Sequence, residues 1–227
     1  MVPTSLPALP AEGLRARKKR RTRQSISDIA TRLFFEHGFE EVTLADIAEA
    51  AEVSVKTIFN YFGSKEDLFF DRIEELRESL VTTIVDRPPG TTVLGALETL
   101  LLDNRVPFAG EGWDGLRDAE VYEGFRTFLA TQENSPALRA RRLVIVEQIG
   151  KLLGDVLAAE LEPEREAPAL RALAAMLAAA LELRAEVLCT EILARTSTAE
   201  VRRRVTVVVE ETFRRLTAAF GDLDRPR

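Results

Sequence analysis

The strongest constraint on the fold is a pair of short helical segments joined by a very short turn. Residues 44–51 and 55–61 both have the apolar spacing of a helix, and about three residues separate them. Helices joined so closely must cross at a steep angle, which is the geometry of a helix-turn-helix. The stretch from residue 38 to residue 68 therefore predicts this motif.

Capping residues and apolar side chains define the two helices of this motif. Thr43 and Asp46 have capping-box spacing at the start of the first helix, and Ser54 is an N-cap residue for the second. The side chains expected to lock the crossing are Leu44, Ile47, Ala48, Ala51, Val53, Ile58 and Phe62. The second helix keeps an outer face, suited to a DNA major groove, that is formed by Val55, Lys56, Thr57, Asn60 and Tyr61.

The rest of the chain is also predicted to be helical, because Ala, Leu, Glu and Arg dominate it. We expect an all-α fold in which Gly38 ends the first helix in a left-handed cap. Disorder is expected for residues 1–14, where prolines are frequent. The expected helices cover residues 17–37, 44–51, 55–61, 65–85, 92–106, 116–133, 136–161, 168–195 and 198–220.

The residue inventory excludes several classes of protein. The chain has 227 residues but one cysteine, Cys189, and one histidine, His37, so it can form no intramolecular disulfide and no cysteine–histidine zinc site. Its many carboxylates are typical of solvated helix faces, so we expect no enzyme, no metal and no cofactor. It also lacks a signal-peptide pattern and an apolar run of about 18 residues, which predicts a cytoplasmic protein without a membrane partner.

The charge is distributed unevenly along the chain. Residues 1–26 contain seven basic side chains and one acidic side chain, although the whole chain has a net charge of −6. A basic stretch attracts polyanions, because each neutralised phosphate releases a counterion. A solubilising terminus is an equally good interpretation of composition alone, and a membrane-binding patch is a weaker one.

An ordered set of residues in this region resembles the tetracycline-repressor (TetR) family of bacterial transcription regulators. The matching residues are Thr43, Ile47, Ala48, Ala51, Val53, Ser54, Thr57, Phe59, Tyr61, Phe62, Lys65, Glu66 and Leu68. The resemblance is strong over residues 20–72 and elsewhere extends only to length, helical content and loop placement. It implies a helix-turn-helix DNA-binding domain at 15–63 and a helical effector-binding and dimerisation domain at 64–227.

The resemblance also implies roles for single residues. Thr43 and the start of its helix would bind a phosphate, and Tyr61 and Lys65 would hold the flanking phosphate. Bases or nearby backbone would be met by Ser54, Val55, Lys56, Thr57 and Asn60, and Arg20 and Arg21 of the basic stretch would add contacts to DNA. The sequence departs from the family at Glu52, where glycine is usual, and at Phe59, where tyrosine is frequent and packing is expected to be kept.

The last two predicted helices have apolar stripes that predict a homodimer. One stripe contains Leu170, Leu173, Leu177, Leu181, Ala185, Leu188 and Ile192. The other contains Val201, Val205, Val208, Thr212, Leu216 and Ala219, and is widened by Val209, Phe213 and Phe220. A four-helix bundle with a second copy would cover both stripes, whereas the alternative is an ordinary core within one chain.

The middle helices concentrate aromatic and polar residues that could line an effector cavity. These residues are Phe108, Trp113, Tyr122, Phe125, Phe128, Gln132 and Arg184. Aromatic stripes also occur in ordinary cores, but the resemblance implies an enclosed apolar site here. Arg184 falls within an apolar stripe and needs a partner, for which an effector, Glu98 and a dimer contact are the alternatives.

These observations together predict a ligand-responsive repressor that binds a palindromic double-stranded DNA operator as a homodimer. A small apolar or aromatic effector is expected to release it. The alternatives are an architectural DNA-binding protein that senses nothing and, less well supported, an α-helical enzyme or carrier.

Overall fold

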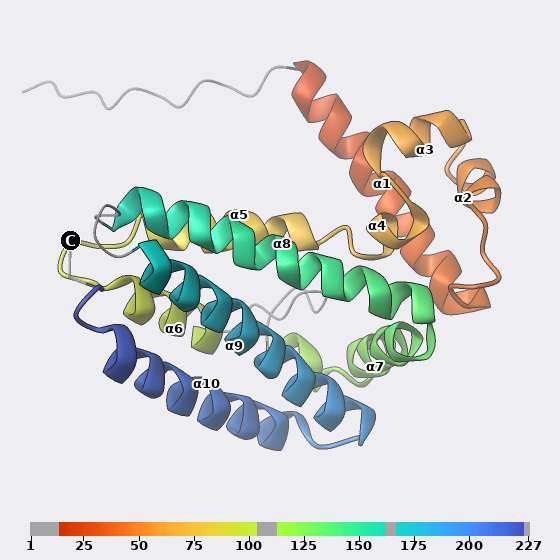
Figure 1. The fold of residues 1–227 in the computed structure, drawn as a ribbon. Coiled ribbons are helices and arrows are strands. Elements are labelled where there is room, and N and C mark those ends of the chain that lie inside the picture. Colours follow the sequence, from red (N-terminus) through yellow and green to blue (C-terminus); the bar gives the residue numbers. More distant parts are fainter. Residues whose placement is uncertain (1–13, 104–112, 162–166, 225–227) are drawn as a thin grey trace, which may run out of the picture. The chain divides into compact units, whose positions relative to one another are not determined.

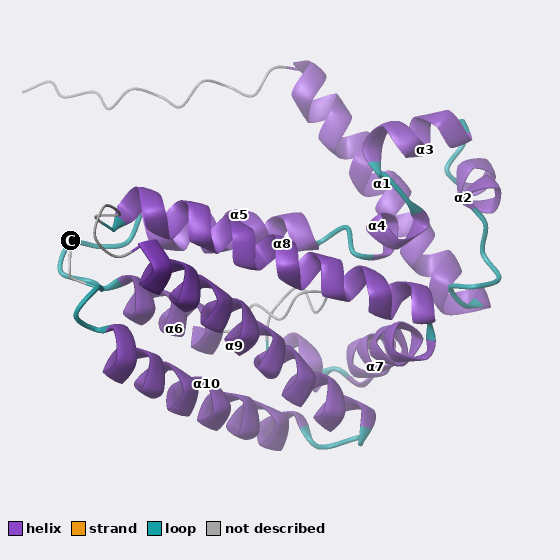
Figure 2. Cartoon of the chain, in the orientation of Figure 1, coloured by secondary structure: helices purple, strands orange, loops and turns teal. Residues whose placement is uncertain are grey.

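The computed structural model describes residues 14–103, 113–161 and 167–224, and every regular element in this part of the chain is a helix (Figure 2). The all-α prediction is confirmed. The first helices are α1 (Leu14–His37), α2 (Leu44–Ala50), α3 (Val55–Tyr61), α4 (Lys65–Phe69) and α5 (Ile73–Val85). They are followed by α6 (Val93–Asp103), the 3₁₀ helix η1 (Gly115–Arg117), α7 (Ala119–Asn134), α8 (Pro136–Glu160), α9 (Ala167–Leu193) and α10 (Thr198–Phe220).

The chain divides into two compact units, Met1–Asp71 and Arg72–Arg227 (Figure 1). The first contains α1 to α4, and the second contains α5 to α10. The boundary between the compact units follows Asp71. The predicted boundary between a DNA-binding and an effector-binding domain, after residue 63, remains a prediction.

The basic stretch near the N-terminus belongs to a helix. The predicted disordered arm lies outside the described residues except for Leu14, where α1 begins, so residues 17–23 are helical. At the other end of α1, Gly38 has φ +87° and its amide donates to the Phe34 carbonyl at 3.0 Å. The left-handed cap predicted for Gly38 is confirmed.

An aromatic cluster forms the centre of the first unit. Phe34 of α1, Phe39 of the following loop and Phe69 of α4 have ring centroids 5.1 to 5.8 Å apart, and all three are buried. Ile47 of α2 and Ile58 of α3 are also buried. The long helix α1 therefore provides the platform on which the three short helices pack.

The single helix predicted over residues 65–85 is wrong, because the chain breaks into α4 and α5 at Phe70–Arg72. Phe69 and Phe70 are both buried, with their rings 5.2 Å apart in an edge-to-face arrangement. Adjacent residues of a continuous helix point about 100° apart, so burying both rings in one core favours ending the helix there. The break also leaves Asp71 within reach of α1, where it pairs with Arg23.

The second unit is a helical bundle built around the pairing of α8 with α9 (Figure 1). A Cβ atom placed on Gly150 would lie 3.5 Å from that of Ala178, and one on Gly154 would lie 3.7 Å from that of Ala174. These small residues let the two backbones approach closely. α10 packs on α9 and α6, α5 packs on α6 and α8, and α7 packs on α8 and α9.

The apolar stripes of α9 and α10 are buried in part within one chain. Leu173 and Ile192 of α9, and Val201 and Phe213 of α10, are among their buried members. α10 packs on both α9 and α6, so one chain covers part of each stripe, while Ala185 and Ala219 stay exposed. The homodimer itself remains a prediction.

A buried carboxylate ties the end of the chain to α6. Asp224 is 3% exposed, and its two oxygens accept hydrogen bonds from the amides of Val93 at 2.7 Å and Leu94 at 2.8 Å. These amides begin α6 and have no partner within the helix. A residue 130 positions away thus caps α6.

We expect Asp224→Ala to lower the free energy of unfolding of the second unit by about 2 kcal/mol, because two buried amides lose a charged acceptor. Chemical denaturation followed by circular dichroism measures this change. The control is Asp222→Ala, which removes an exposed carboxylate two residues away and should change the free energy by less than about 0.5 kcal/mol. Equal losses for the two variants would contradict the capping role.

Candidate nucleic-acid interface

Thr43 and Asp46 form a reciprocal cap at the start of α2. The Thr43 amide donates to Asp46 Oδ2 at 2.8 Å, and the Asp46 amide donates to Thr43 Oγ1 at 3.2 Å. The predicted capping box is confirmed. Hydrogen bonds from the side chain and backbone of Thr43 lower the pKa of the Asp46 carboxyl. The Thr43 hydroxyl donates to the same carboxylate, at 2.7 Å, so the phosphate contact predicted for Thr43 remains a proposal.

The turn between α2 and α3 is held by backbone hydrogen bonds. The amides of Glu52 and Val53 donate to the carbonyls of Glu49 at 3.1 Å and Ala48 at 2.9 Å. Ser54 then caps α3 by accepting from the Thr57 amide at 3.0 Å, and the Ser54 and Thr57 hydroxyls lie 2.8 Å apart. The turn and the Ser54 cap thus orient α3 without any contribution from its outer side chains.

α3 has one buried side and one exposed side. Ile58 on α3 and Phe62 just after it are buried, while Val55, Lys56 and Asn60 are exposed. Thr57 and Tyr61 are half-buried at the edges of the exposed side. The structure therefore brings Val55, Lys56 and Asn60 together on an outer face and puts Ser54 at its start.

Phe59 corrects one expectation from the sequence. It is 53% exposed on α3, so the packing role expected for it is wrong. Residue 59 follows Val55 by four positions and Lys56 by three, which places all three on one helix face. This spacing could have identified Phe59 as a fourth member of the outer face.

Lys65 is engaged by the protein itself. Its Nζ atom donates to the carbonyls of Phe39 at 2.8 Å and Val42 at 3.1 Å, and lies 4.2 Å from the centroid of the Phe39 ring. Two of its three N–H groups are thus used to hold the loop that leads into Thr43. One donor is left for the phosphate contact predicted from the sequence.

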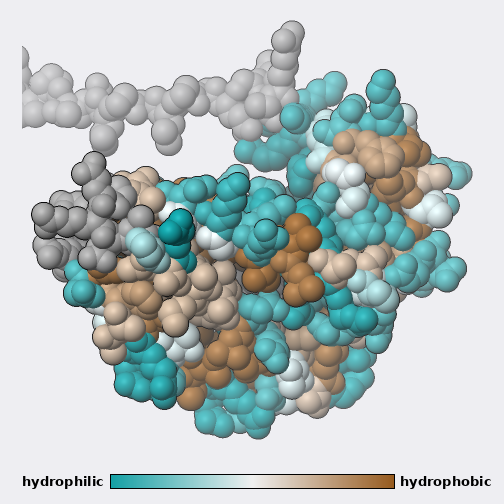
Figure 3. All heavy atoms as spheres, in the orientation of Figure 1, coloured by the Kyte–Doolittle hydropathy of each residue, from teal (hydrophilic) through white to brown (hydrophobic). Residues whose placement is uncertain are grey.

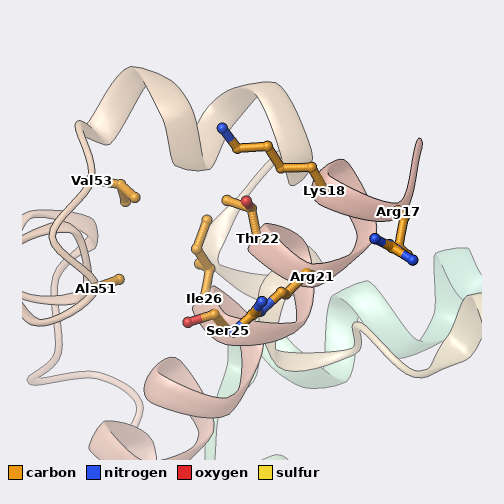
Figure 4. A pocket seen from close by; sticks show the side chains of 8 residues that line it. All are labelled: Arg17, Lys18, Arg21, Thr22, Ser25, Ile26, Ala51 and Val53. Carbon is orange, nitrogen blue, oxygen red and sulfur yellow. The ribbon is translucent and has the colours of Figure 1, made fainter. Parts of the chain in front are cut away.

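The N-terminal half of α1 has a basic face beside the turn. Arg17, Lys18 and Arg21 line an open hollow of about 620 Å³ together with Thr22, Ser25, Ile26, Ala51 and Val53 (Figure 4). Ile26 is buried, whereas the three basic side chains are exposed. Arg20, also predicted to meet DNA, is exposed on the same helix. The hollow combines cations and hydroxyls with an apolar floor.

The predicted effector residues lie in the second unit, except that Phe108 falls outside the described residues. Phe125, Phe128 and Gln132 share the buried side of α7, and Trp113 is buried before η1. Tyr122 is half-buried, and its hydroxyl donates to the carbonyl of Thr196 at 2.8 Å. The Tyr122 hydroxyl is therefore used to join α7 to the turn after α9.

Arg184 is 8% exposed on α9, and its Nε atom donates to the Leu101 carbonyl of α6 at 3.3 Å. Burial lowers the pKa of this guanidinium to about 10. Through this hydrogen bond Arg184 is directed toward α6, while the aromatic side chains Phe125 and Phe128 belong to α7.

Residues 26–71 match the family described as bacterial regulatory proteins, tetR family. This is the segment whose caps, turn and exposed face are described above. Over these residues the chain is similar to the tetR family. The regulator TcmR of Streptomyces glaucescens is 40% identical over 85 residues, which are 37% of this chain and 38% of TcmR. The repressor AcnR of Corynebacterium efficiens is 35% identical over 77 residues, which are 34% and 41% of the two chains.

The chain thus spans about two-fifths of the length of these relatives. The similarity in fold extends further. A structure described as a SmeT–triclosan complex matches 88% of this chain and 91% of SmeT, with a TM-score of 0.52 and 16% sequence identity. The likeness in fold to SmeT therefore extends beyond residues 26–71, the segment that matches the family. No helix in the described ranges is long and apolar enough to cross a membrane.

Glu52 occupies the turn position at which the tetR family usually has glycine, and its φ is +53°. Glu52 therefore adopts the left-handed conformation. A residue other than glycine is destabilised by about 1–2 kcal/mol in this conformation, so replacing it with glycine relieves that strain. Glycine also adds conformational freedom to the unfolded chain, which cancels part of the gain in stability.

We expect Glu52→Gly to raise the free energy of unfolding of the first unit by about 0.5–1 kcal/mol. Urea denaturation followed by circular dichroism tests this. Glu52→Gln is the matched control, since it removes the charge but keeps the strained φ, and it should leave stability nearly unchanged. A gain of the same size in Glu52→Gln would assign the effect to charge rather than backbone strain.

Proposed function

We propose that this chain is a transcriptional repressor of the tetR family that reads double-stranded DNA with α3. The observation that carries the proposal is the division of α3 into a buried side with Ile58 and an outer face with Val55, Lys56, Phe59 and Asn60. Lys and Asn donate to base edges in the major groove, and apolar side chains contact the thymine methyl group. The repressor name of the relative AcnR supports the direction of regulation.

The basic face of α1 supports contact with the DNA backbone. Arg17, Lys18 and Arg21 add positive charge beside the turn that precedes α3, within a chain of net charge −6. Local positive charge on an acidic protein orients it toward a polyanion. These contacts would position α3 in the groove and make affinity depend on salt, while the α3 face would select the sequence.

A homodimer accounts for how so short a helix could select a site, because two copies read twice as many base pairs. Apolar side chains that one chain leaves exposed support this part of the proposal. Met176 and Leu183 on α9 are 49% and 40% exposed, and Val207 on α10 is 52% exposed. Figure 3 shows apolar patches on this unit among hydrophilic surface. Exposed patches of this kind commonly mark interfaces.

Selection of bound fragments from a random DNA pool tests the proposed function. We expect two inverted half-sites about one helical turn apart, as a symmetric dimer requires. Tyr61→Phe should weaken binding to all sequences by about 1 kcal/mol, since it removes one phosphate hydrogen bond, while Lys56→Ala and Asn60→Ala should change the selected bases. Lys151→Ala, which removes an exposed lysine of the second unit, is the control and should change neither property.

Each alternative gives a different result in this selection. A pool without any enriched sequence would favour the architectural DNA-binding protein, and a single half-site would contradict the dimer. A changed consensus for Tyr61→Phe, with none for Lys56→Ala and Asn60→Ala, would overturn the assignment of the α3 face.

We also propose that a small apolar or aromatic molecule binds in the second unit and releases the repressor from DNA. The buried side of α7, with Phe125, Phe128 and Gln132, has the mixture of aromatic rings and a few polar groups that is typical of ligand sites. The triclosan complex of SmeT, a protein of the same fold, supports an aromatic ligand. Regulation requires that the ligand bind the DNA-free form more tightly than the DNA-bound form.

Triclosan, followed by a panel of aromatic and long-chain compounds, is the probe for this site. A matching compound should lower operator affinity by about 5- to 150-fold, which corresponds to a coupling of roughly 1–3 kcal/mol. It should also change the emission of Trp113, which is the only tryptophan of the chain and is buried. Phe125→Trp, which fills space in the proposed site, should imitate or block the response. If no compound changes operator affinity in the wild type, the proposal of a sensor is wrong.

A further inference from the structure

The guanidinium of Arg23 on α1 contacts three partners in the first unit. Its NH1 atom donates to the Tyr61 carbonyl at 2.6 Å, and its NH2 atom forms an ion pair and a short hydrogen bond with Asp71 Oδ1. Its Cζ atom lies 4.3 Å from the centroid of the Phe62 ring. One side chain of α1 thus joins the end of α3 to the residue that follows α4 by two positions.

Partial burial strengthens this arrangement. The side chains of Arg23 and Asp71 are 32% and 12% exposed, so the pair is shielded from water more than a surface ion pair is. The guanidinium is planar and can donate to two acceptors at once while it stacks on an aromatic ring. Lysine has the same charge but lacks the planar guanidinium, so it could make only some of the contacts with the Tyr61 carbonyl, the Asp71 carboxylate and the Phe62 ring.

The Tyr61 carbonyl lies at the end of α3 and needs a hydrogen-bond donor from outside the helix. α3 has seven residues, and the last carbonyls of a helix have no partner within it. The Phe62 amide still donates to Ile58 at 2.8 Å, but the chain then leaves the helix with extended backbone at Phe62. Arg23 therefore fixes the end of α3 from which the Tyr61 side chain projects.

We propose that Arg23 is a positioning residue for DNA binding. It sets the Tyr61 end of α3 for its contact with DNA and, through Asp71, connects that end to the last residue of the first unit. Arg72, the first residue of the second unit, follows Asp71 directly in the chain, so displacement of this junction reaches α3 through Arg23. The inference rests on the proposed function, because it concerns how well α3 binds an operator.

A double-mutant cycle of operator affinity separates positioning from direct contact. We expect Arg23→Gln to weaken binding about tenfold, and by a clearly smaller factor when Tyr61 is already Phe, because groups that act together are not additive. Arg23→Lys, which keeps the charge, should fall between wild type and Arg23→Gln. Arg32→Gln removes an exposed charge from the same helix and should combine additively with Tyr61→Phe. Additivity of Arg23→Gln with Tyr61→Phe would overturn the proposal.

Neutralising Asp71 tests the proposal, because electrostatics and positioning predict opposite changes in DNA affinity. Removing a negative charge near DNA should strengthen binding by simple electrostatics. Positioning predicts that Asp71→Asn weakens it about threefold, because Arg23 loses its anchor. Asp28→Asn, which neutralises an exposed carboxylate of α1, is the control and should leave affinity unchanged or raise it. Tighter binding by Asp71→Asn would contradict the inference.

Amide hydrogen exchange tests positioning without DNA and keeps the two proposals separate. In Arg23→Gln the amide of Phe62, bonded to Ile58, should exchange faster. The amide of Ala51, bonded to Ile47 at the end of α2, should keep its rate. Equal acceleration of both amides, or of neither, overturns the positioning role. If wild type selects no DNA, the proposed function fails even where the exchange result holds.

Discussion

A helix of seven residues closes too few hydrogen bonds to persist in water, and the helix with the proposed DNA-reading face, α3, has seven residues. Its order must come from the neighbouring parts of the first unit. Ser54 caps its start, Ile58 anchors its buried side, and Arg23 holds the carbonyl of Tyr61 at its end. The long helix α1 supplies the surface for these contacts. The exposed face of α3 can therefore vary in sequence without loss of the fold.

Five cations of the first unit illustrate two roles that a count of charges cannot separate. Arg23 and Lys65 donate to backbone carbonyls and lie over aromatic rings, so they hold the helices in place. Arg17, Lys18 and Arg21 remain exposed around the hollow beside the turn. A half-buried cation is stable only with acceptors nearby, and helix ends and loops provide them. The electrostatic surface available to DNA is thus smaller than the basic composition suggests.

The parts of the fold that were predictable from the sequence depend on residues a few positions apart. The capping box of Thr43 and Asp46 and the cap at Gly38 both involve such local relations. The errors concern which side chains the tertiary structure buries. The helix ends after Phe69 where two adjacent rings are both buried, Phe59 is exposed on α3, and part of the apolar stripe of α10 is covered by α9 and α6 of the same chain. Periodicity identifies an apolar face, but it does not identify the surface that covers it.

The junction between α4 and α5 determines what regulation would require. Arg72 begins α5 without a side-chain cap, and the first bond of that helix, from the Leu76 amide to the Arg72 carbonyl, is long at 3.4 Å. The proposed release from DNA requires a coupling of about 1–3 kcal/mol between effector and DNA. Arg23 contacts both Asp71, directly before this junction, and the carbonyl at the end of α3, so it is the side chain through which a change at Asp71 would reach α3.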